Sequence, residues 1–249
     1  MIKDNNNQPF YFSNSIVLLP LFFVLAMWLV YWIEIKHSFN FWHYGIYPRK
    51  IYGLKGIFFS PFIHGNLTHI TNNSLALIVL LPILRFFYRK QTLKVVVIGL
   101  LFSGLGTWLI GRSSYHIGAS GFIYALVSFI FFKGIFTKYY RLVAVSLTIV
   151  ILYGGMLWFM FPNVDNSLSW EGHLSGFIVG LCLALITKTP QFNTLIYDWQ
   201  QPDFNPQNDV FMKNFDEHGN FNPPPKPEEI IKDYFNSSIK VIYEFFGKK

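Results

Sequence analysis

Charged residues are scarce in this sequence. They make up 13% of its 249 residues, whereas a soluble domain usually needs about 25% to cover its surface in water. Cysteine is nearly absent as well: the single Cys182 excludes a disulfide within the chain and fits a packing role. A His-Glu-x-x-His zinc motif does not occur. These absences argue against a soluble globular protein, a disulfide-stabilised domain and a zinc site of that type.

Apolar residues make up 52% of the chain and come in six blocks. A helix needs about 20 residues to cross a bilayer core of roughly 30 Å. The first and fifth blocks are long enough alone, and the others need the polar or aromatic residues at their ends. Core helices of a soluble protein are the alternative, but six in succession with so little charge between them argue against it. We therefore expect an all-α membrane protein with six transmembrane helices over Ile16–Ile33, His69–Leu84, Val95–Ile110, Gly121–Phe132, Leu142–Phe161 and His173–Ile186.

The basic residues lie mainly in alternate links between these blocks. The net charge of +7 is thus a topology signal, and we expect no nucleic-acid partner. Because short basic loops remain on the cytoplasmic side, both termini are expected inside. The long first link is also basic, yet this topology places it outside, and its many aromatic residues indicate a folded element in the interface. The two basic links that lack acids carry Arg85, Arg89, Lys90 and Lys94, and Lys133, Lys138 and Arg141.

This topology brings together polar residues from three helices. The second, fourth and sixth helices run from outside to inside, so their first turns lie at one depth near the outer face. Polar groups within a membrane are costly and usually face the bundle interior. A serine needs a neighbouring base to become a nucleophile, and histidine suits that role near neutral pH. The polar residues of these turns are His64, His69, Asn73, Ser120, Tyr124 and His173.

The fourth apolar block is short, which places Ser120 below the membrane surface. About 12 residues separate Ser120 from Lys133, or roughly 18 Å of helix. If Lys133 marks the inner interface, Ser120 lies about 10 Å below the outer one. A hydrolase at that depth needs a water-filled cavity that opens to the outside.

Glycines accompany both the serine and the histidine. Gly118 and Gly121 allow a tight turn and a close approach of neighbouring helices. A glycine at every fourth position of the sixth helix predicts close contact with a neighbour, for which the fourth helix is the natural candidate: Gly172, Gly176 and Gly180. Taken alone, a Gly-Ala-Ser-Gly string is a common packing element, and a histidine at a helix end is often an interfacial anchor.

The combination resembles the rhomboid family of intramembrane serine proteases. The similarity covers about residues 15–187, and its motifs are Gly118-Ala119-Ser120-Gly121 with Tyr124, Gly172-His173 with Gly176 and Gly180, and the stretch from His64 to Asn73. The sequence departs from the family in the first outer loop, where many members carry a Trp-Arg pair and this chain has Tyr47-Pro48-Arg49.

The resemblance implies a role for each site residue. Ser120 is the implied nucleophile and His173 the general base, in a dyad without an aspartate, and Tyr124 would stack on the His173 ring. His69, Asn73 and the Ser120 backbone N–H would form the oxyanion hole, and His64 matches a position near the site. Neither a metal nor an organic cofactor is implied.

The predicted function is that of an intramembrane serine endopeptidase that cleaves transmembrane segments of membrane-protein substrates within the lipid bilayer. The alternative is a catalytically silent rhomboid-like protein that binds client helices. A small transporter or channel would show charged residues inside several spans, and only Arg85 is a strong candidate here. The resemblance to this family implies a location in the bacterial cytoplasmic membrane, and the topology implies an active site that opens to the outer face.

The composition changes after Pro190 to Asn, Gln, Asp and Pro. We therefore expect a cytoplasmic N-terminal segment over residues 1–14, a six-helix rhomboid protease domain over 15–188, and a cytoplasmic C-terminal tail over 189–249. Within the tail, 204–226 reads as an extended, proline-rich linker. Residues 228–246 read as an amphipathic helix that could lie on the inner leaflet or dock against a partner, or remain a solvated tail.

Overall fold

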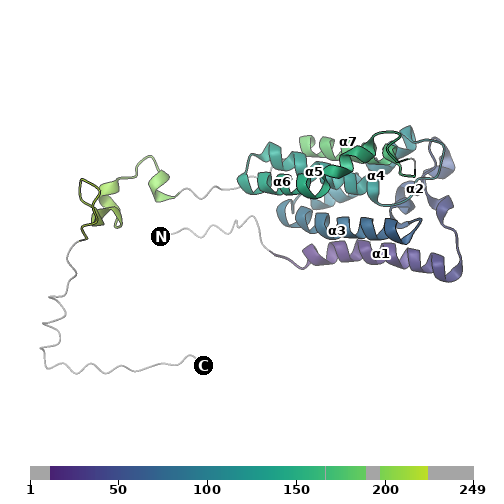
Figure 1. Ribbon diagram of the computed structural model, residues 1–249, viewed down its shortest axis with the longest axis horizontal. Coiled ribbons are helices and arrows are strands. Elements are labelled where there is room, and N and C mark those ends of the chain that lie inside the picture. The colour runs from purple at the N-terminus through teal and green to yellow at the C-terminus, as the bar shows by residue number, and fades with distance from the viewer. Residues whose placement is uncertain (1–11, 166, 189–196, 224–249) are drawn as a thin grey trace, which may run out of the picture. The chain divides into compact units, whose positions relative to one another are not determined.

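The computed structural model describes residues 12–165, 167–188 and 197–223. The chain forms two compact units, residues 1–192 and 193–249, and each is described by itself. The first unit is a bundle of helices (Figure 1). Its α-helices are α1 (Ser15–His37), α2 (Gly56–Phe59), α3 (Leu67–Phe87), α4 (Thr92–Ile110), α5 (Ser120–Thr137), α6 (Tyr140–Tyr153) and α7 (Trp170–Ile186).

The expected all-α membrane architecture is confirmed. Five helical segments are long and apolar enough to span a bilayer: α1, α3, α4, α5, and α6 continued by the 3₁₀ helix η4 (Gly154–Met160). Helix α7 is also apolar but has 17 residues, the short end of what crosses a membrane. The sixth span therefore stays a prediction. Within the described residues, β-structure is limited to two isolated bridges.

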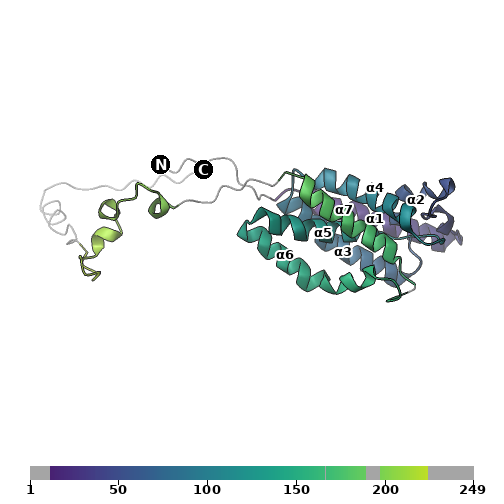
Figure 2. The ribbon, with the colours of Figure 1, turned by 90° about the horizontal axis from the view of Figure 1, so that it is seen from above.

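Helix α5 lies at the centre of the bundle, in contact with α3, α4, α6 and α7 (Figures 1 and 2). Its closest neighbour is α7, because the α7 glycines lie directly against the α5 backbone. A Cβ atom added to Gly176 would lie 2.8 Å from the Gly121 carbonyl carbon, and one added to Gly180 would lie 2.8 Å from Ser128 Cβ. Lipid tails are as apolar as the side chains, so close van der Waals packing of this kind replaces the hydrophobic effect as the force between helices.

Polar contacts also join α5 to α7. The Ser128 hydroxyl donates to the Phe177 carbonyl at 2.7 Å. Lys133, which is 1% exposed, donates to the carbonyls of Ala184 and Thr187 at the end of α7. The last carbonyls of a helix lack partners within the helix and carry partial negative charge, so an ammonium group stabilises them. The Lys133 side chain is thus enclosed by the bundle, where it caps α7; its depth at the inner interface stays a prediction.

The link between α1 and α3 folds into short helical turns, at the end of the bundle where α2 lies (Figure 2). Besides α2 it contains η1 (Trp42–Tyr44), η2 (Ile51–Gly53) and η3 (Ser60–Phe62). Arg49, in the region where the Trp-Arg pair is missing, donates to the Gly111 carbonyl at 2.7 Å and to the Leu109 carbonyl at 3.3 Å. The link is thereby fastened to the C-terminal end of α4.

The described part of the second unit consists of turns. It contains η5 (Asp198–Gln200), η6 (Pro206–Asn208) and η7 (Met212–Asn214), and a bridge pairs Phe215 with Phe221. Between 204 and 223 the chain is thus more folded than the extended linker that we expected. The reason is local: the Asp209 and Asp216 carboxylates accept backbone N–H groups two to four residues further on. The expected helix over 228–246 lies outside the described residues.

Candidate active site

A glycine turn places Ser120 at the first position of α5. Gly118 has φ +100°, a conformation that favours glycine, and its N–H donates to the Ser60 carbonyl at 2.8 Å. A Cβ atom on Gly118 would collide with the His69 ring and would lie 3.3 Å from the Asn73 amide nitrogen. The turn therefore brings the backbone just before Ser120 against the side chains of α3.

Helix α7 supplies the histidine in its first turn. His173 Nε2 lies 3.1 Å from Ser120 Oγ, and His173 Nδ1 lies 2.9 Å from the Phe159 carbonyl oxygen. Because a carbonyl only accepts hydrogen bonds, Nδ1 must carry the proton and donate it to Phe159. Nε2 is then an acceptor for the Ser120 hydroxyl. This tautomer is the one that a general base for Ser120 requires.

Tyr124 fixes the plane of the His173 ring. The two rings stack with their centroids 4.3 Å apart and their planes 12° apart. The Tyr124 hydroxyl donates to the Met156 carbonyl at 2.6 Å. Met156 and Phe159 both belong to η4, so this short 3₁₀ helix supplies the carbonyl that orients the base and the carbonyl that orients its stacking partner. Sequence reasoning missed both carbonyls, since a backbone oxygen leaves no mark in residue identity.

The start of α3 supplies hydrogen-bond donors beside Gly118. Asn66 caps this helix, its side chain accepting the His69 N–H at 2.8 Å. The Asn73 amide donates one N–H to His64 Nε2 at 2.9 Å, and His64 Nδ1 lies 3.3 Å from the Phe62 carbonyl. Burial, and secondarily the nearby His69, lowers the pKa of His64 to about 3. His64 is therefore neutral at pH 7 and can hold the Asn73 amide by accepting from it.

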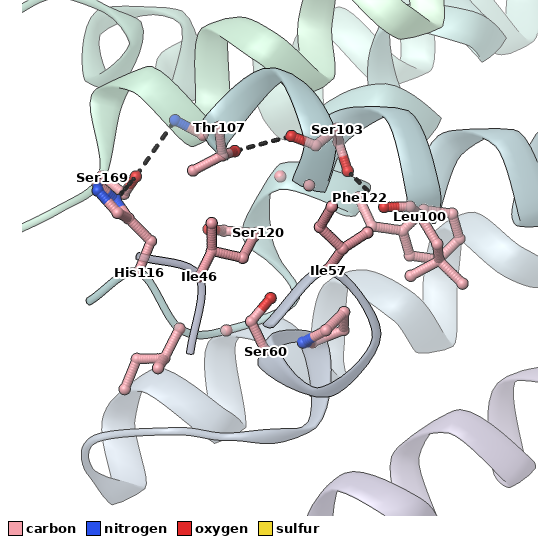
Figure 3. Close-up of a pocket in the computed structure, with 16 residues that line it drawn as sticks. Ile46, Ile57, Ser60, Leu100, Ser103, Thr107, His116, Ser120, Phe122 and Ser169 are labelled. Atoms are coloured by element: carbon pink, nitrogen blue, oxygen red, sulfur yellow. Dashed lines mark hydrogen bonds between the residues drawn. The ribbon is translucent and has the colours of Figure 1, made fainter. Parts of the chain in front are cut away.

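A cavity of about 30 Å³ adjoins Ser120 (Figure 3). That volume accommodates one or two water molecules. Its polar lining includes the hydroxyl groups of Ser60, Ser103 and Thr107 and the ring of His116, groups that can hydrogen-bond water. Within the described residues, no cluster of three or more His, Cys, Asp or Glu side chains could hold a metal ion.

A second serine–histidine contact lies at the edge of this cavity. His116 Nδ1 is 2.6 Å from Ser169 Oγ, and Figure 3 shows the two side chains together. Ser169 caps α7, its oxygen accepting the Gly172 N–H at 3.2 Å. Sequence reasoning missed this pair, because both residues lie in links between the apolar blocks. Ser120 differs from Ser169 in that it directly follows the Gly118 turn, which lies against the side chains of His69 and Asn73.

The arrangement thus combines a hydroxyl nucleophile, a base in the accepting tautomer and donors next to the Gly118 turn. These are the elements that acyl transfer through a serine requires. The structure brings together all the residues that the sequence singled out around Ser120: His64, His69, Asn73, Gly118, Gly121, Tyr124, Gly172 and His173.

Comparison with known proteins identifies the family. The family model of the Rhomboid domain matches residues 52–189. An uncharacterized protein of Mycobacterium tuberculosis is 32% identical over 179 residues, which cover 69% of this chain and 75% of the relative. An uncharacterized protein of Mycobacterium leprae is 31% identical over 181 residues, covering 68% of this chain and 71% of the relative. This chain is therefore a multi-pass membrane protein that belongs to the rhomboid family.

Proposed function

We propose that this protein is an intramembrane serine endopeptidase that cleaves transmembrane segments of other membrane proteins. The observation that carries the proposal is the 3.1 Å contact between Ser120 Oγ and His173 Nε2, with the His173 proton held on Nδ1 by the Phe159 carbonyl. A serine that only packed between helices would need no base in the accepting tautomer.

The reaction begins when Ser120 Oγ attacks the carbonyl carbon of the scissile peptide bond. His173 Nε2 takes the hydroxyl proton, and the imidazolium stays hydrogen-bonded to the Phe159 carbonyl through Nδ1–H. The negative oxygen of the tetrahedral intermediate accepts hydrogen bonds from the Ser120 N–H, the Asn73 amide and the His69 ring. Donors of this type contribute about 3–4 kcal/mol each to the stabilisation of the transition state.

Collapse of the intermediate breaks the C–N bond, and the leaving amine takes the proton from His173. Water then attacks the carbonyl carbon of the acyl-enzyme, and His173 takes a proton from it. The bond from this carbon to Ser120 Oγ breaks, and His173 returns the proton to Oγ, which regenerates Ser120 and releases the acid. The cavity that adjoins Ser120 can hold this water.

The substrate must expose an amide that its own helix shields by hydrogen bonding. Cleavage therefore favours segments that unwind easily, and leucine substitutions around a cleaved bond are expected to slow cleavage. The site opens to the outer face, and both termini lie in the cytoplasm, in accordance with the basic links that follow α3 and α5. A bacterial cytoplasmic membrane is the proposed location.

The test is cleavage of a transmembrane reporter by the purified full-length chain in liposomes. Ser120→Ala and His173→Ala are expected to abolish cleavage while the helical content remains. Ser167→Ala is the matched control, because its hydroxyl contacts only Asp165 in an exposed link among the contacts described; cleavage should be unchanged. Ser169→Ala distinguishes the second serine–histidine contact: cleavage should be slower but not abolished, and labelling of Ser120 should persist.

Labelling with a fluorophosphonate, which reacts with activated serines, supplies a readout that does not depend on the reporter. Labelling of the wild type that is lost in Ser120→Ala supports the proposal. Activity that survives Ser120→Ala would show that the nucleophile is wrongly assigned. A wild type that neither cleaves several reporters nor takes up the label would favour a client-binding protein without protease activity.

A further inference from the structure

Two polar contacts at the outer end of the bundle join the segment that leads to Ser120 with the start of α7. They pair Arg112 with Glu171 and His116 with Ser169. We propose that these four residues form a clamp that sets the position of His173 relative to Ser120. The clamp residues are positioning residues that do not touch the substrate, and the inference rests on the proposed protease function. They are called the outer clamp below.

The first half of the outer clamp is an ion pair between a buried carboxylate and an arginine whose side chain is 40% exposed. The Glu171 side chain is 2% exposed, and its two oxygens accept from the Arg112 backbone N–H at 3.0 Å and from Arg112 Nη1 at 3.2 Å. Arg112 Nη2 also donates to the Leu168 carbonyl at 2.8 Å. A buried carboxylate that loses its partner is strongly destabilised. Glu171 therefore holds the first turn of α7 against the link that follows α4.

The second half is a hydrogen-bond relay with only one consistent assignment of protons. The Arg112 carbonyl lies 3.1 Å from His116 Nε2 and can only accept, so Nε2 carries the proton. His116 Nδ1 must then accept from the Ser169 hydroxyl, whose oxygen accepts from the Gly172 N–H. Burial lowers the pKa of His116, which favours this neutral form. One imidazole thus connects the cap of α7 to the segment before Ser120.

Both halves act close to the dyad. Glu171 precedes His173 by two residues, and His116 precedes Ser120 by four. The His116 backbone is itself fixed to the link between α1 and α3, because it pairs with Ile46 through bonds of 2.8 and 2.9 Å. Ser120 Oγ and His173 Nε2 are 3.1 Å apart. If α7 moved away by about half an ångström, this distance would be too long for a hydrogen bond. Misplacement of about 1 Å can cost on the order of 100-fold in rate.

The test measures kcat and KM of the full-length protein for a transmembrane reporter, with the active sites counted by fluorophosphonate labelling. Glu171→Ala and His116→Ala are expected to lower kcat per labelled site by on the order of 10- to 100-fold, with KM nearly unchanged. Glu171→Gln keeps an acceptor for the Arg112 N–H, and His116→Asn keeps an acceptor near Nδ1, so both should recover part of the rate.

Asp165→Asn is the matched control for Glu171→Gln. It makes the same change from acid to amide in the link just before α7, but at a carboxylate that is fully exposed and that, among the contacts described, bonds only to Ser167. Its kcat should equal that of the wild type. If Glu171→Ala lowers thermal stability but keeps kcat per labelled site at the wild-type value, the positioning role is wrong and the clamp is only structural.

Hydrogen exchange of the amides of residues 169–173 separates this inference from the proposed function. Faster exchange in Glu171→Ala than in Asp165→Asn is expected whether or not the protein is a protease. A wild type that neither cleaves nor takes up the label would refute the protease function alone. The clamp would then be judged by hydrogen exchange: equal exchange rates in Glu171→Ala and Asp165→Asn would refute it.

Discussion

Replacement of Gly176 by alanine tests whether the glycine contact between α5 and α7 holds the dyad together. The new Cβ atom would lie 2.8 Å from the Gly121 carbonyl carbon, 3.1 Å from Tyr124 Cβ, and closer still to the Gly121 oxygen. Carbon atoms in contact need about 3.5 Å, so α7 must move away from α5 by at least about 0.7 Å. The obstacle is backbone, which cannot rotate aside as a side chain does.

That displacement is large compared with the tolerance of the site. His173 lies on α7 three residues before Gly176, and its Nε2 atom is 3.1 Å from Ser120 Oγ. A separation larger by about 0.7 Å leaves hydrogen-bond range. We expect kcat to fall by about 100-fold and the free energy of unfolding to fall by about 1–3 kcal/mol, as for other overpacked sites.

The assay is reporter cleavage per fluorophosphonate-labelled site, together with unfolding in detergent of the same preparations. Gly155→Ala is the control, because a Cβ atom there has no neighbour within 4 Å; it should change neither quantity. If Gly176→Ala kept the wild-type kcat, the added methyl group would fit without moving α7 away from Gly121, and the reasoning would be refuted.

Three further predictions concern single side chains of the bundle. Tyr124→Phe keeps the ring stack and should retain most of kcat, whereas Tyr124→Ala should lose about 10-fold or more; equal rates would refute the orienting role. Lys133→Met removes the donor to the end of α7 and should lower the free energy of unfolding in detergent by about 1–3 kcal/mol; an unchanged value would contradict the capping role. The unfolded chain binds protons at His64 near its ordinary pKa of 6.5, whereas the folded chain does so near 3. Stability is therefore full above pH 6.5 and is lost as the pH falls, by about 2 kcal/mol at pH 5. His64→Gln should remove this part of the acid sensitivity in unfolding titrations. If the variant lost stability with falling pH as the wild type does, the role of His64 would be contradicted.

The sequence predicts the helices well where hydrophobicity and capping agree. The apolar blocks reveal each long helix, and polar residues at the starts, such as Asn66 before α3 and Ser169 before α7, extend the helices beyond the apolar runs. The gathering of Ser120, His173 and Asn73 follows from the alternating direction of the spans, since three helix starts at one depth leave few arrangements.

The remaining contacts depend on geometry that residue identity does not encode. The carbonyl that orients His173 is a backbone atom of Phe159, and any residue there would supply it. Lys133 reads as an interface residue because its partners lie about fifty residues further on. Arg112, His116 and Ser169 lie in links without periodic patterns, and Glu171 follows such a link in the first turn of α7. Nothing in the sequence therefore pairs them before the bundle is assembled.

The enclosure of Lys133 has a consequence for biosynthesis. Its ammonium and the Ser128 hydroxyl find their partners on α7, which is made after α5. Until α7 emerges, the newly made chain holds a lysine and a serine hydroxyl in the membrane without these acceptors, and Ser120 lacks its contact with His173. When α7 packs against α5, it supplies the acceptors for Lys133 and Ser128 and the histidine beside Ser120 at the same time. A chain interrupted before α7 therefore lacks the contacts that stabilise α5 and also lacks the contact between Ser120 and His173.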